Sequence, residues 1–167
     1  MCTVDGTDFR IREPKPFNPG WYSHKFKGPG VRYEVALSIN GGDIVHINGP
    51  FMCGHWPDLK IFREKLKHKL DPNEMVEADA GYRGEPNKCR VPADYQHARH
   101  KRQKCRARAR QETVNRRFKQ FGVLSQRFRH RVTCENLSLH KTVFEAVVVI
   151  TQLTINNGDR LFPVNFH

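Results

Sequence analysis

Residues 31–47 alternate apolar and polar side chains on either side of one turn sequence, Asn40-Gly41-Gly42-Asp43. A period of two is typical of a β-strand with one buried face, and Gly-rich Asn and Asp turns favour a tight reversal between two strands. The pattern predicts a β-hairpin, with one strand over residues 31–39 and its partner beginning at residues 44–47.

The segments on both sides of this hairpin carry weaker patterns. Residues 2–11 are strand-like and lead into a Pro- and Gly-rich connection over residues 14–30. Short strands are expected at residues 75–78 and 88–91. Apolar residues spaced three and four apart predict a helix over residues 56–70, with one buried stripe made of Leu59, Phe62, Leu66 and Leu70. A long polar helix is expected over residues 93–121, and another over 140–156, although the β-branched residues 147–150 leave a strand as an alternative there.

The order strand, hairpin, helix, strand and basic helix is typical of a ribonuclease-H-like α/β domain, which has a mixed sheet flanked by helices. In such a domain, acids from the first and fourth strands meet a third acid from a later helix. Many other α/β domains share the order, so the pattern alone leaves the fold open. With 167 residues and 38% hydrophobic content, the chain fits one domain, residues 1–167, with a modest core.

Positive charge is concentrated in one part of the chain. Residues 88–131 contain 15 Lys and Arg against two acids, Asp94 and Glu112, and so carry essentially the whole net charge of +12. Lys and Arg that neutralise phosphates gain free energy from counterion release, so nucleic acid is the expected partner. A solvated basic helix is the plainer interpretation of the same charges.

Three acids occupy positions that suit a metal site. Asp5 lies in the predicted first strand, Asp79 lies at the C-terminal end of strand 75–78, and Glu112 lies in the basic helix. Mg²⁺ prefers oxygen ligands and is usually held by one or two carboxylates together with phosphate oxygens. Three convergent carboxylates in a basic protein therefore predict phosphodiester chemistry.

Each of these acids also has a plainer interpretation. Asp5 fits a surface turn, and Asp79 fits a helix N-cap or a turn bond to its own backbone. Glu112 fits a helix salt bridge with Arg108 or Arg116, which contributes only about 0.3 to 0.5 kcal/mol.

The basic helix is amphipathic in its C-terminal half. Ala107, Val114, Phe118 and Phe121 follow helical spacing for burial, whereas Arg108, Glu112, Asn115 and Lys119 repeat along another face. Glu112 is thus expected on a ridge of cationic and amide side chains.

The cysteines and hydropathy bear on the compartment. The five cysteines are odd in number and form no CxxC pair, which is typical of reduced intracellular thiols. No signal peptide is recognised, and the longest strongly apolar stretch, residues 144–153, is far shorter than the roughly 20 residues that cross a bilayer. We expect no membrane association and no secretion, and a nuclear protein in a eukaryote or otherwise a cytoplasmic one.

Five short motifs in the sequence are more specific than the order of the predicted elements. They are Val4-Asp5-Gly6-Thr7, residues 22–28, residues 56–62, Ala78-Asp79-Ala80-Gly81-Tyr82, and residues 108–119. Together they resemble the catalytic domain of DDE-type transposases, the Harbinger-like branch of the DDE superfamily endonucleases, over nearly the full length. In that family the third acid belongs to a Tyr, Arg, Glu, Lys signature; Arg108, Glu112 and Lys119 match its last three positions, and Cys105 replaces the Tyr.

The resemblance implies a metal-dependent DNA endonuclease and strand transferase of the ribonuclease-H-like fold. Asp5, Asp79 and Glu112 would be both the catalytic residues and the ligands of two Mg²⁺ or Mn²⁺ ions, one activating a water or a DNA 3′ hydroxyl and the other stabilising the leaving oxygen. Phosphates of the element end would be held by DNA-binding residues, which we expect to be Arg108, Lys119, Arg116, Asn115 and Lys25.

One departure concerns recognition of DNA sequence. The family places a helix-turn-helix-type reader before the first catalytic strand, whereas Asp5 is the fifth residue here. We therefore expect a catalytic domain without that reader, with a separate DNA-binding protein supplying site recognition, and a homo-oligomer as a further possibility. A catalytically silent or domesticated DNA-binding remnant is the main alternative, and a basic RNA-binding protein with incidental acids is a third.

Asp58 is a possible additional site residue. It precedes Leu59 where a helix should begin, which fits an acid that complements the helix dipole, yet related transposases often keep an acid at this place. The remaining aspartates, Asp8, Asp43, Asp71 and Asp94, are interpreted as turn or surface acids.

Overall fold

The computed structural model describes residues 1–130 and 137–164, in which the elements follow one another in the predicted order. The strands are β1 (Cys2–Arg10), β2 (Tyr22–Ser23), β3 (Gly28–Ser38), β4 (Ile44–Met52), β5 (Val76–Glu77) and β6 (Cys89–Arg90). The α-helices are α1 (Asp58–Glu64), α2 (Ala98–Phe118), α3 (Gly122–Ser125) and α4 (Ser138–Asn156). Short 3-10 turns are η1 (Pro19–Trp21), η2 (Leu66–Lys69), η3 (Ala80–Tyr82) and η4 (Pro92–Asp94).

Within these residues one mixed sheet contains six strands, in the order β2-β3-β1-β5-β6 with β4 paired to β3. β1 runs antiparallel to β3, with Asp5 opposite Val35, and parallel to β5, with Cys2 opposite Val76. The hairpin predicted from residues 31–47 is confirmed as β3 and β4, and both strands extend beyond the predicted bounds. The result is the α/β class expected, consistent with a ribonuclease-H-like domain.

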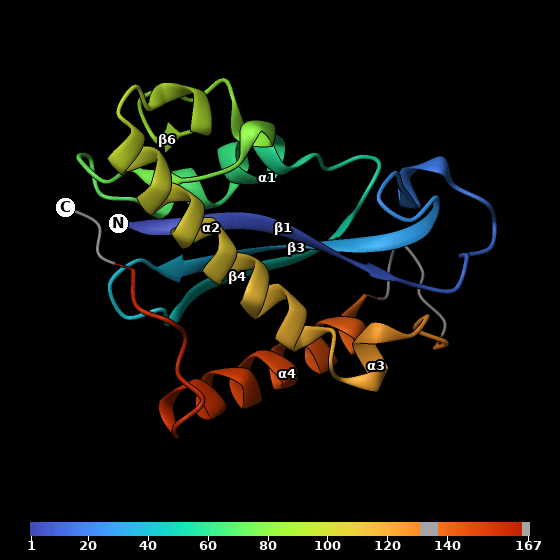
Figure 1. The fold of residues 1–167 in the computed structure, drawn as a ribbon. Coiled ribbons are helices and arrows are strands. Elements are labelled where there is room, and N and C mark those ends of the chain that lie inside the picture. Colours follow the sequence, from blue (N-terminus) through green and yellow to red (C-terminus); the bar gives the residue numbers. More distant parts are fainter. Residues whose placement is uncertain (131–136, 165–167) are drawn as a thin grey trace.

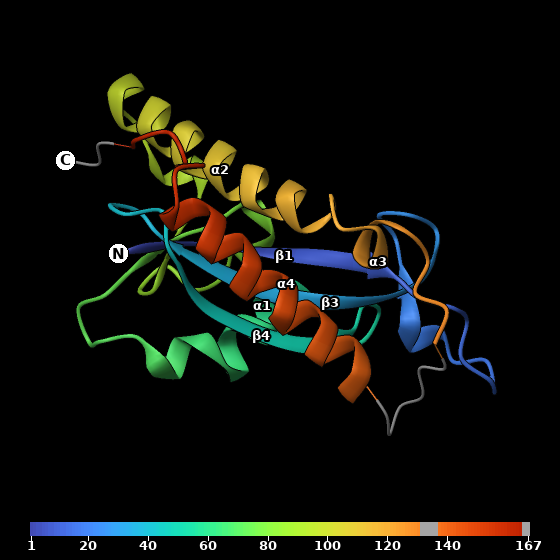
Figure 2. The ribbon, with the colours of Figure 1, turned by 90° about the horizontal axis from the view of Figure 1, so that it is seen from below.

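Helices cover both faces of the sheet. Figures 1 and 2 show α2 and α4 against one face and α1 against the other. The residues of β1 and β3 alternate between the two sides, so Phe9 and Tyr33 pack with Phe144 of α4, whereas Val4 and Ala36 face the opposite cluster. β1 is thus buried between two helical layers, and any polar side chain on it is held within a packed environment.

The predicted apolar stripe of the basic helix is confirmed for most of its length. Ala107, Val114 and Phe118 are fully buried, and Phe121 is partly buried against the same cluster. The C-terminal helix is confirmed as α4, so the strand alternative for residues 147–150 is wrong. Its β-branched residues divide between the core and solvent as helical periodicity requires, because Val147 and Val148 are buried and Val149 and Ile150 are exposed.

Two helix boundaries differ from the prediction. The helix expected over residues 56–70 ends at Glu64, because Lys65 leaves helical geometry, and a 3-10 turn then carries Leu66 into the core. The basic helix begins at Ala98 rather than at residue 93, because residues 92–94 form η4. The Val91 amide donates to the Asp94 carboxylate at 2.7 Å and closes this turn.

Four of the five cysteines lie in the described residues, where Cys2, Cys53, Cys89 and Cys105 are free thiols; Cys134 lies outside them. No helix within residues 1–130 and 137–164 is long and apolar enough to cross a membrane.

Candidate active site

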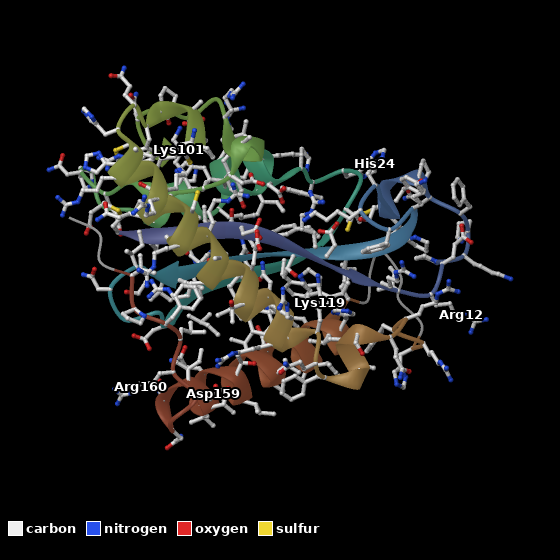
Figure 3. All side chains as sticks on the ribbon, viewed as in Figure 1. Arg12, His24, Lys101, Lys119, Asp159 and Arg160 are labelled. Atoms are coloured by element: carbon white, nitrogen blue, oxygen red, sulfur yellow. The ribbon has the colours of Figure 1, made fainter. Side chains whose placement is uncertain are left out.

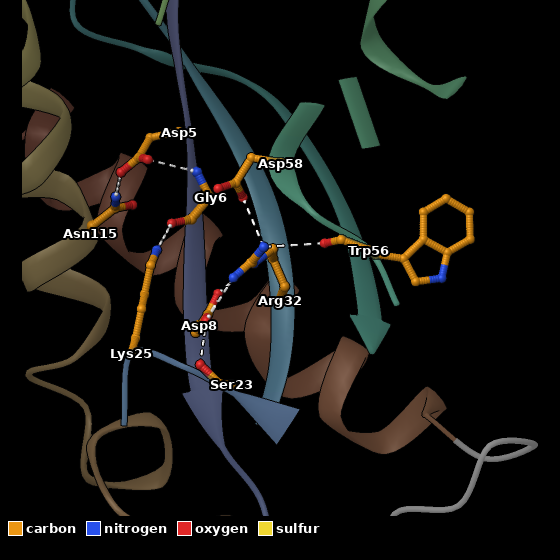
Figure 4. A network of polar contacts seen from close by, with 9 residues as sticks. All are labelled: Asp5, Gly6, Asp8, Ser23, Lys25, Arg32, Trp56, Asp58 and Asn115. Carbon is orange, nitrogen blue, oxygen red and sulfur yellow. Dashed lines mark hydrogen bonds and ion pairs between the residues drawn. The ribbon is translucent and has the colours of Figure 1, made fainter. Parts of the chain in front are cut away.

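Asp5 lies in the middle of β1 on the face covered by α2. Its Oδ1 accepts a hydrogen bond from the Gly6 amide at 2.8 Å, and its Oδ2 accepts one from Asn115 Nδ2, also at 2.8 Å. Figure 4 shows the Asn115 amide reaching Asp5 from α2. Both oxygens are therefore oriented by donors, one from the strand itself and one from the helix above it.

Asp79 lies two residues after β5 and is the N-cap of η3. Its Oδ1 accepts a hydrogen bond from the Gly81 amide at 2.7 Å, so the N-cap role that the sequence allows is present. Because β5 is parallel to β1, the C-terminal end of β5 brings Asp79 toward the part of β1 that carries Asp5. The capping bond occupies one oxygen and fixes the orientation of the carboxyl group.

Glu112 lies on the exposed side of α2. In the described part of the chain its carboxylate forms no ion pair with Arg108 or Arg116, so the plain salt-bridge interpretation is not supported by the geometry. An exposed glutamate without a fixed partner keeps its rotamer freedom, which leaves it able to reorient toward a bound cation.

One cavity of about 180 Å³ is lined by all three acids. Its other lining residues are Thr3, Val4, Lys25, Glu77, Arg108 and Gln111. A neighbouring cavity of about 320 Å³ shares Asp5, Lys25 and Glu112 with the first and is completed by Gly6, Thr7, Asn115, Arg116 and Lys119. The two cavities therefore adjoin at Asp5, Lys25 and Glu112, and both are lined by acids and cations.

Burial is the main influence on the acid of β1. It raises the pKa of Asp5 to about 6, with smaller contributions from the negative charges of Asp58 and Asp79, while the Lys25 ammonium opposes the rise. Near neutral pH Asp5 is thus ionised but close to its titration point. A cation bound beside it would favour the ionised form.

Lys25 approaches this region from the turn between β2 and β3. Its Nζ donates to the carbonyl oxygen of Gly6 at 2.9 Å, which places an ammonium group next to Asp5 without an ion pair to it. Lys119 lies at the end of α2, with its Nζ 5.8 Å from the centre of the Phe9 ring (Figure 3). Burial and the nearby Lys25 lower the pKa of Lys119.

The structure divides the five expected DNA-binding residues into two groups. Arg108 lines the cavity of the three acids, and Arg116 and Lys119 line its neighbour, while Lys25 lines both. Asn115 differs from them because it is only 9% exposed and its amide nitrogen is engaged by Asp5.

Asp58 lies on the other side of β1 from Asp5 (Figure 4). Its Oδ1 is 3.3 Å from Nη1 of Arg32, and its carboxyl group packs against Gly6, where a β-carbon would come within 2.0 Å of Oδ1. Burial raises the pKa of Asp58, and Arg32 opposes that rise. Asp58 begins α1, as expected, but it does not line the cavity of the three acids.

The expectation that Asp8 is a surface or turn acid is wrong. Asp8 is 3% exposed and accepts two hydrogen bonds from Arg32, at 2.7 and 3.0 Å, and one from Ser23 at 2.7 Å. Burial opposes its ionisation, but the bonds from Arg32 outweigh this and hold the pKa of Asp8 below its ordinary value. Asp8 is buried because the even-numbered residues of β1 face α1. Sequence reasoning missed this burial because it treated Asp8 by itself and not as part of the alternation along the strand.

Sequence reasoning also missed residues that support the cavity. Glu77 is fully buried, accepts hydrogen bonds from Lys104 Nζ at 2.8 Å and from the Tyr95 hydroxyl, and lines the cavity. Gln111 is buried and bonds Thr3. The spacing of Glu77 two residues before Asp79 was the only available signal, since alternation along extended backbone places both side chains on one side.

The donor set fits a hard divalent cation, because all three acids line one cavity and can offer carboxylate oxygens there. Lys25 and Arg108 line the same cavity and carry the positive charge that a phosphate would contact. Their present spacing is looser than a formed site: among the described residues, no three His, Cys, Asp or Glu side chains are close enough together to hold one metal ion. Glu112, being exposed, is the one of the three acids with the greatest freedom to close that gap.

Comparison with known families identifies one family. The family described as DDE superfamily endonuclease matches residues 4–154, a span that includes Asp5, Asp79 and Glu112. No curated protein and no solved structure gives a significant match. The match covers most of the chain, and the chain therefore belongs to the DDE superfamily endonucleases.

Proposed function

We propose that this endonuclease-family protein is a metal-dependent DNA endonuclease and strand transferase of the transposase type, which cleaves phosphodiester bonds at the ends of a mobile element. The observation that carries the proposal is the single cavity lined by Asp5, Asp79 and Glu112. Two Mg²⁺ or Mn²⁺ ions held by these carboxylates would supply neutralisation of the charge that develops on the attacking and leaving oxygens.

The residues around the acids have separate roles in this proposal. Arg108 on one side, and Arg116 and Lys119 on the other, hold backbone phosphates across the two cavities. Lys25 keeps a positive charge over the backbone of β1 beside Asp5. These contacts to phosphate do not distinguish one base sequence from another, so we assign recognition of an element end to a separate DNA-binding protein.

A catalytically silent DNA-binding module is the second candidate. The spacing of the acids favours it, because no three metal-binding side chains among the described residues are close enough to share one ion as they stand. The basic surface alone would then account for DNA binding. In either case the place of action is the compartment that holds DNA, the nucleus in a eukaryote and otherwise the cytoplasm.

Nicking of supercoiled plasmid tests the proposal, with Mg²⁺, with Mn²⁺ and with EDTA. We expect metal-dependent nicking that is lost in each of Asp5→Ala, Asp79→Ala and Glu112→Ala, because each removes one carboxylate. Glu64→Ala is the matched control, since Glu64 is an exposed helical glutamate at the end of α1, outside both cavities. A folded wild-type protein that binds DNA and never nicks it supports the silent module instead.

A further inference from the structure

Two buried amide side chains of α2, one turn apart, bond two side chains on the same face of β1. Gln111 Oε1 accepts from the Thr3 hydroxyl at 2.7 Å, and Asn115 Nδ2 donates to Asp5 Oδ2 at 2.8 Å. Residues four apart in a helix rise about 6 Å, and residues two apart in a strand rise about 6.6 Å, so the two repeats match. The two bonds therefore fix the register of α2 along β1.

That register also determines where Glu112 lies. Glu112 follows Gln111 directly and precedes Asn115 by three residues, so both bonded amides flank it on the helix. Gln111 is further anchored because its Nε2 donates to the carbonyl oxygen of Val35 at 3.2 Å. A slide of α2 by one residue would break these bonds and move Glu112 away from the cavity that it shares with Asp5.

We propose that Asn115 is a positioning residue that orients the Asp5 carboxylate for metal binding, an inference that rests on the function proposed above. Asn115 is 9% exposed, so it has little surface to offer a phosphate, and one of the two N–H donors of its amide is used by Asp5. With the Gly6 amide on Oδ1 and Asn115 on Oδ2, the plane of the carboxylate is held by one donor on each oxygen.

The remaining atom of the amide supports the same role. Asn115 Oδ1 is buried and has no hydrogen-bond partner among the described residues. An amide presents a donor to an ionised carboxylate and, after a half-turn, an acceptor to a protonated one. The amide of Asn115 turns Nδ2 toward Asp5 Oδ2, which is the orientation that suits an ionised carboxylate.

The test is an NMR titration of the Asp5 carboxyl carbon in protein without metal or DNA, with Asp5→Asn used to assign the signal. Asn115→Leu is nearly isosteric and lacks the donor. We expect it to raise the titration midpoint of Asp5 by about one pH unit. We also expect it to weaken Mg²⁺ binding at pH 7 by about tenfold, as loss of a bond that orients a metal ligand typically does.

Gln111→Leu is the matched control. It removes a helix-to-strand amide bond one turn away and touches no acid, so it should lower stability while leaving the Asp5 midpoint at the wild-type value. A folded Asn115→Leu protein with a wild-type midpoint overturns the proposal. So does an equal shift of the midpoint in Gln111→Leu, because loosening of α2 would then explain both.

Asn115→Ala provides a second variant in case Asn115→Leu does not fold. It removes the donor to Asp5 Oδ2 without adding bulk or charge, so a raised midpoint is expected and an unchanged one overturns the proposal. The titration is independent of catalysis. A shifted midpoint in protein that never nicks DNA would contradict the proposed enzyme and leave the Asn115–Asp5 coupling in place, whereas an unchanged midpoint in an active nuclease would contradict only the role of Asn115.

Discussion

Lys104 of α2 and Glu77 of β5 form an ion pair of 2.8 Å in which the side chains are 2% and 0% exposed. The pair connects the start of the long basic helix to the strand that leads into Asp79. Burial lowers the pKa of Lys104, and Glu77 opposes that effect. Most of the positive charge on α2 faces solvent, but Lys104 holds the helix to β5, and the buried Arg110 donates to the carbonyl oxygens of Ser38 and Ile39 at the end of β3.

Removing one member of this pair should be costly. Lys104→Met leaves the Glu77 carboxylate buried without its counter-charge, and we expect the free energy of unfolding to fall by about 3 kcal/mol or more. The double variant Lys104→Met/Glu77→Gln should lose less than Lys104→Met alone, because both charges are gone. Urea unfolding measures the stability of the wild type, Lys104→Met and the double variant.

Lys141→Met is the control, since it breaks the exposed ion pair with Glu145 and should change stability by less than about 0.5 kcal/mol. Equal losses in Lys104→Met and Lys141→Met would contradict the prediction.

The burial of Glu34 should make the stability of the protein depend on pH. Glu34 is fully buried on the α1 face, neither of its carboxyl oxygens has a hydrogen-bond partner in the described part of the chain, and burial raises its pKa to about 8, with a further rise from Asp58. A raised pKa in the folded state contributes stability that is present below pH 4.5 and is lost as pH rises toward 8.

Glu34→Gln should therefore be more stable than the wild type at pH 8, and the difference should shrink as pH falls toward 5. Urea unfolding from pH 5 to 8.5 measures the difference between the two proteins. Titration of Asp5 and Asp8 occurs in both and cancels in the comparison, whereas Asp58 and His46, whose Nε2 lies 3.8 Å from Glu34 Oε2, interact with Glu34 and contribute to the same difference. Parallel curves for wild type and variant would show that Glu34 is not the group responsible.

Gly6 is required by close approach rather than by backbone conformation. A β-carbon at this position would lie 2.0 Å from Asp58 Oδ1, and Asp58 has little freedom to withdraw because Arg32 holds it. Gly6→Ala should lower the free energy of unfolding by about 1 to 3 kcal/mol, the usual cost of overpacking. Gly122→Ala is the control: nothing lies within 4 Å of its β-carbon, and an alanine in α3 should be neutral or slightly stabilising. Thermal unfolding compares them, and a neutral Gly6→Ala would contradict the prediction.

The parts of the fold that could be predicted from sequence are those that local sequence patterns determine. The hairpin, the order of elements and the buried stripe of α2 each depend on residues a few positions apart, and a period of two or of 3.6 reveals them. The convergence of Asp5, Asp79 and Glu112 was predicted from their places in the expected strands and helix and from a family resemblance carried by short motifs, and all three line one cavity.

The parts that sequence reasoning missed depend on distant partners. Lys104 lies in the most basic segment of the chain and looked solvated, yet its partner Glu77 is 27 residues away. Asn115 looked like a phosphate contact on an exposed ridge, but its partner Asp5 is 110 residues away. In each case, a polar side chain is buried because one specific partner satisfies it, and no local periodicity identifies such a pair.

DNA affinity should depend on salt through the cations of the two cavities. Arg108→Ala and Lys119→Ala should each weaken DNA binding and reduce the slope of log K against log salt by about one, as loss of a phosphate contact does. Arg160→Ala removes the same charge on a part of the molecule away from Lys119 (Figure 3) and should leave the slope unchanged. Fluorescence anisotropy with a short duplex at several salt concentrations measures the slopes; identical slopes in all variants would show that these cavities do not contact phosphate.

Binding of Mg²⁺ should depend on pH through Asp5. Because the pKa of Asp5 is raised to about 6, the Asp5 carboxyl group of the folded protein is mostly protonated at pH 5 and mostly ionised at pH 7. A metal binds the ionised form and releases the proton, so affinity should rise by about tenfold between these pH values. The rise in melting temperature with added Mg²⁺ reports it, since a ligand of the folded state stabilises that state. Asp5→Asn should abolish the pH dependence and Asp43→Asn should retain it, while a Mg²⁺ effect of equal size at pH 5 and pH 7 would exclude Asp5 as a ligand.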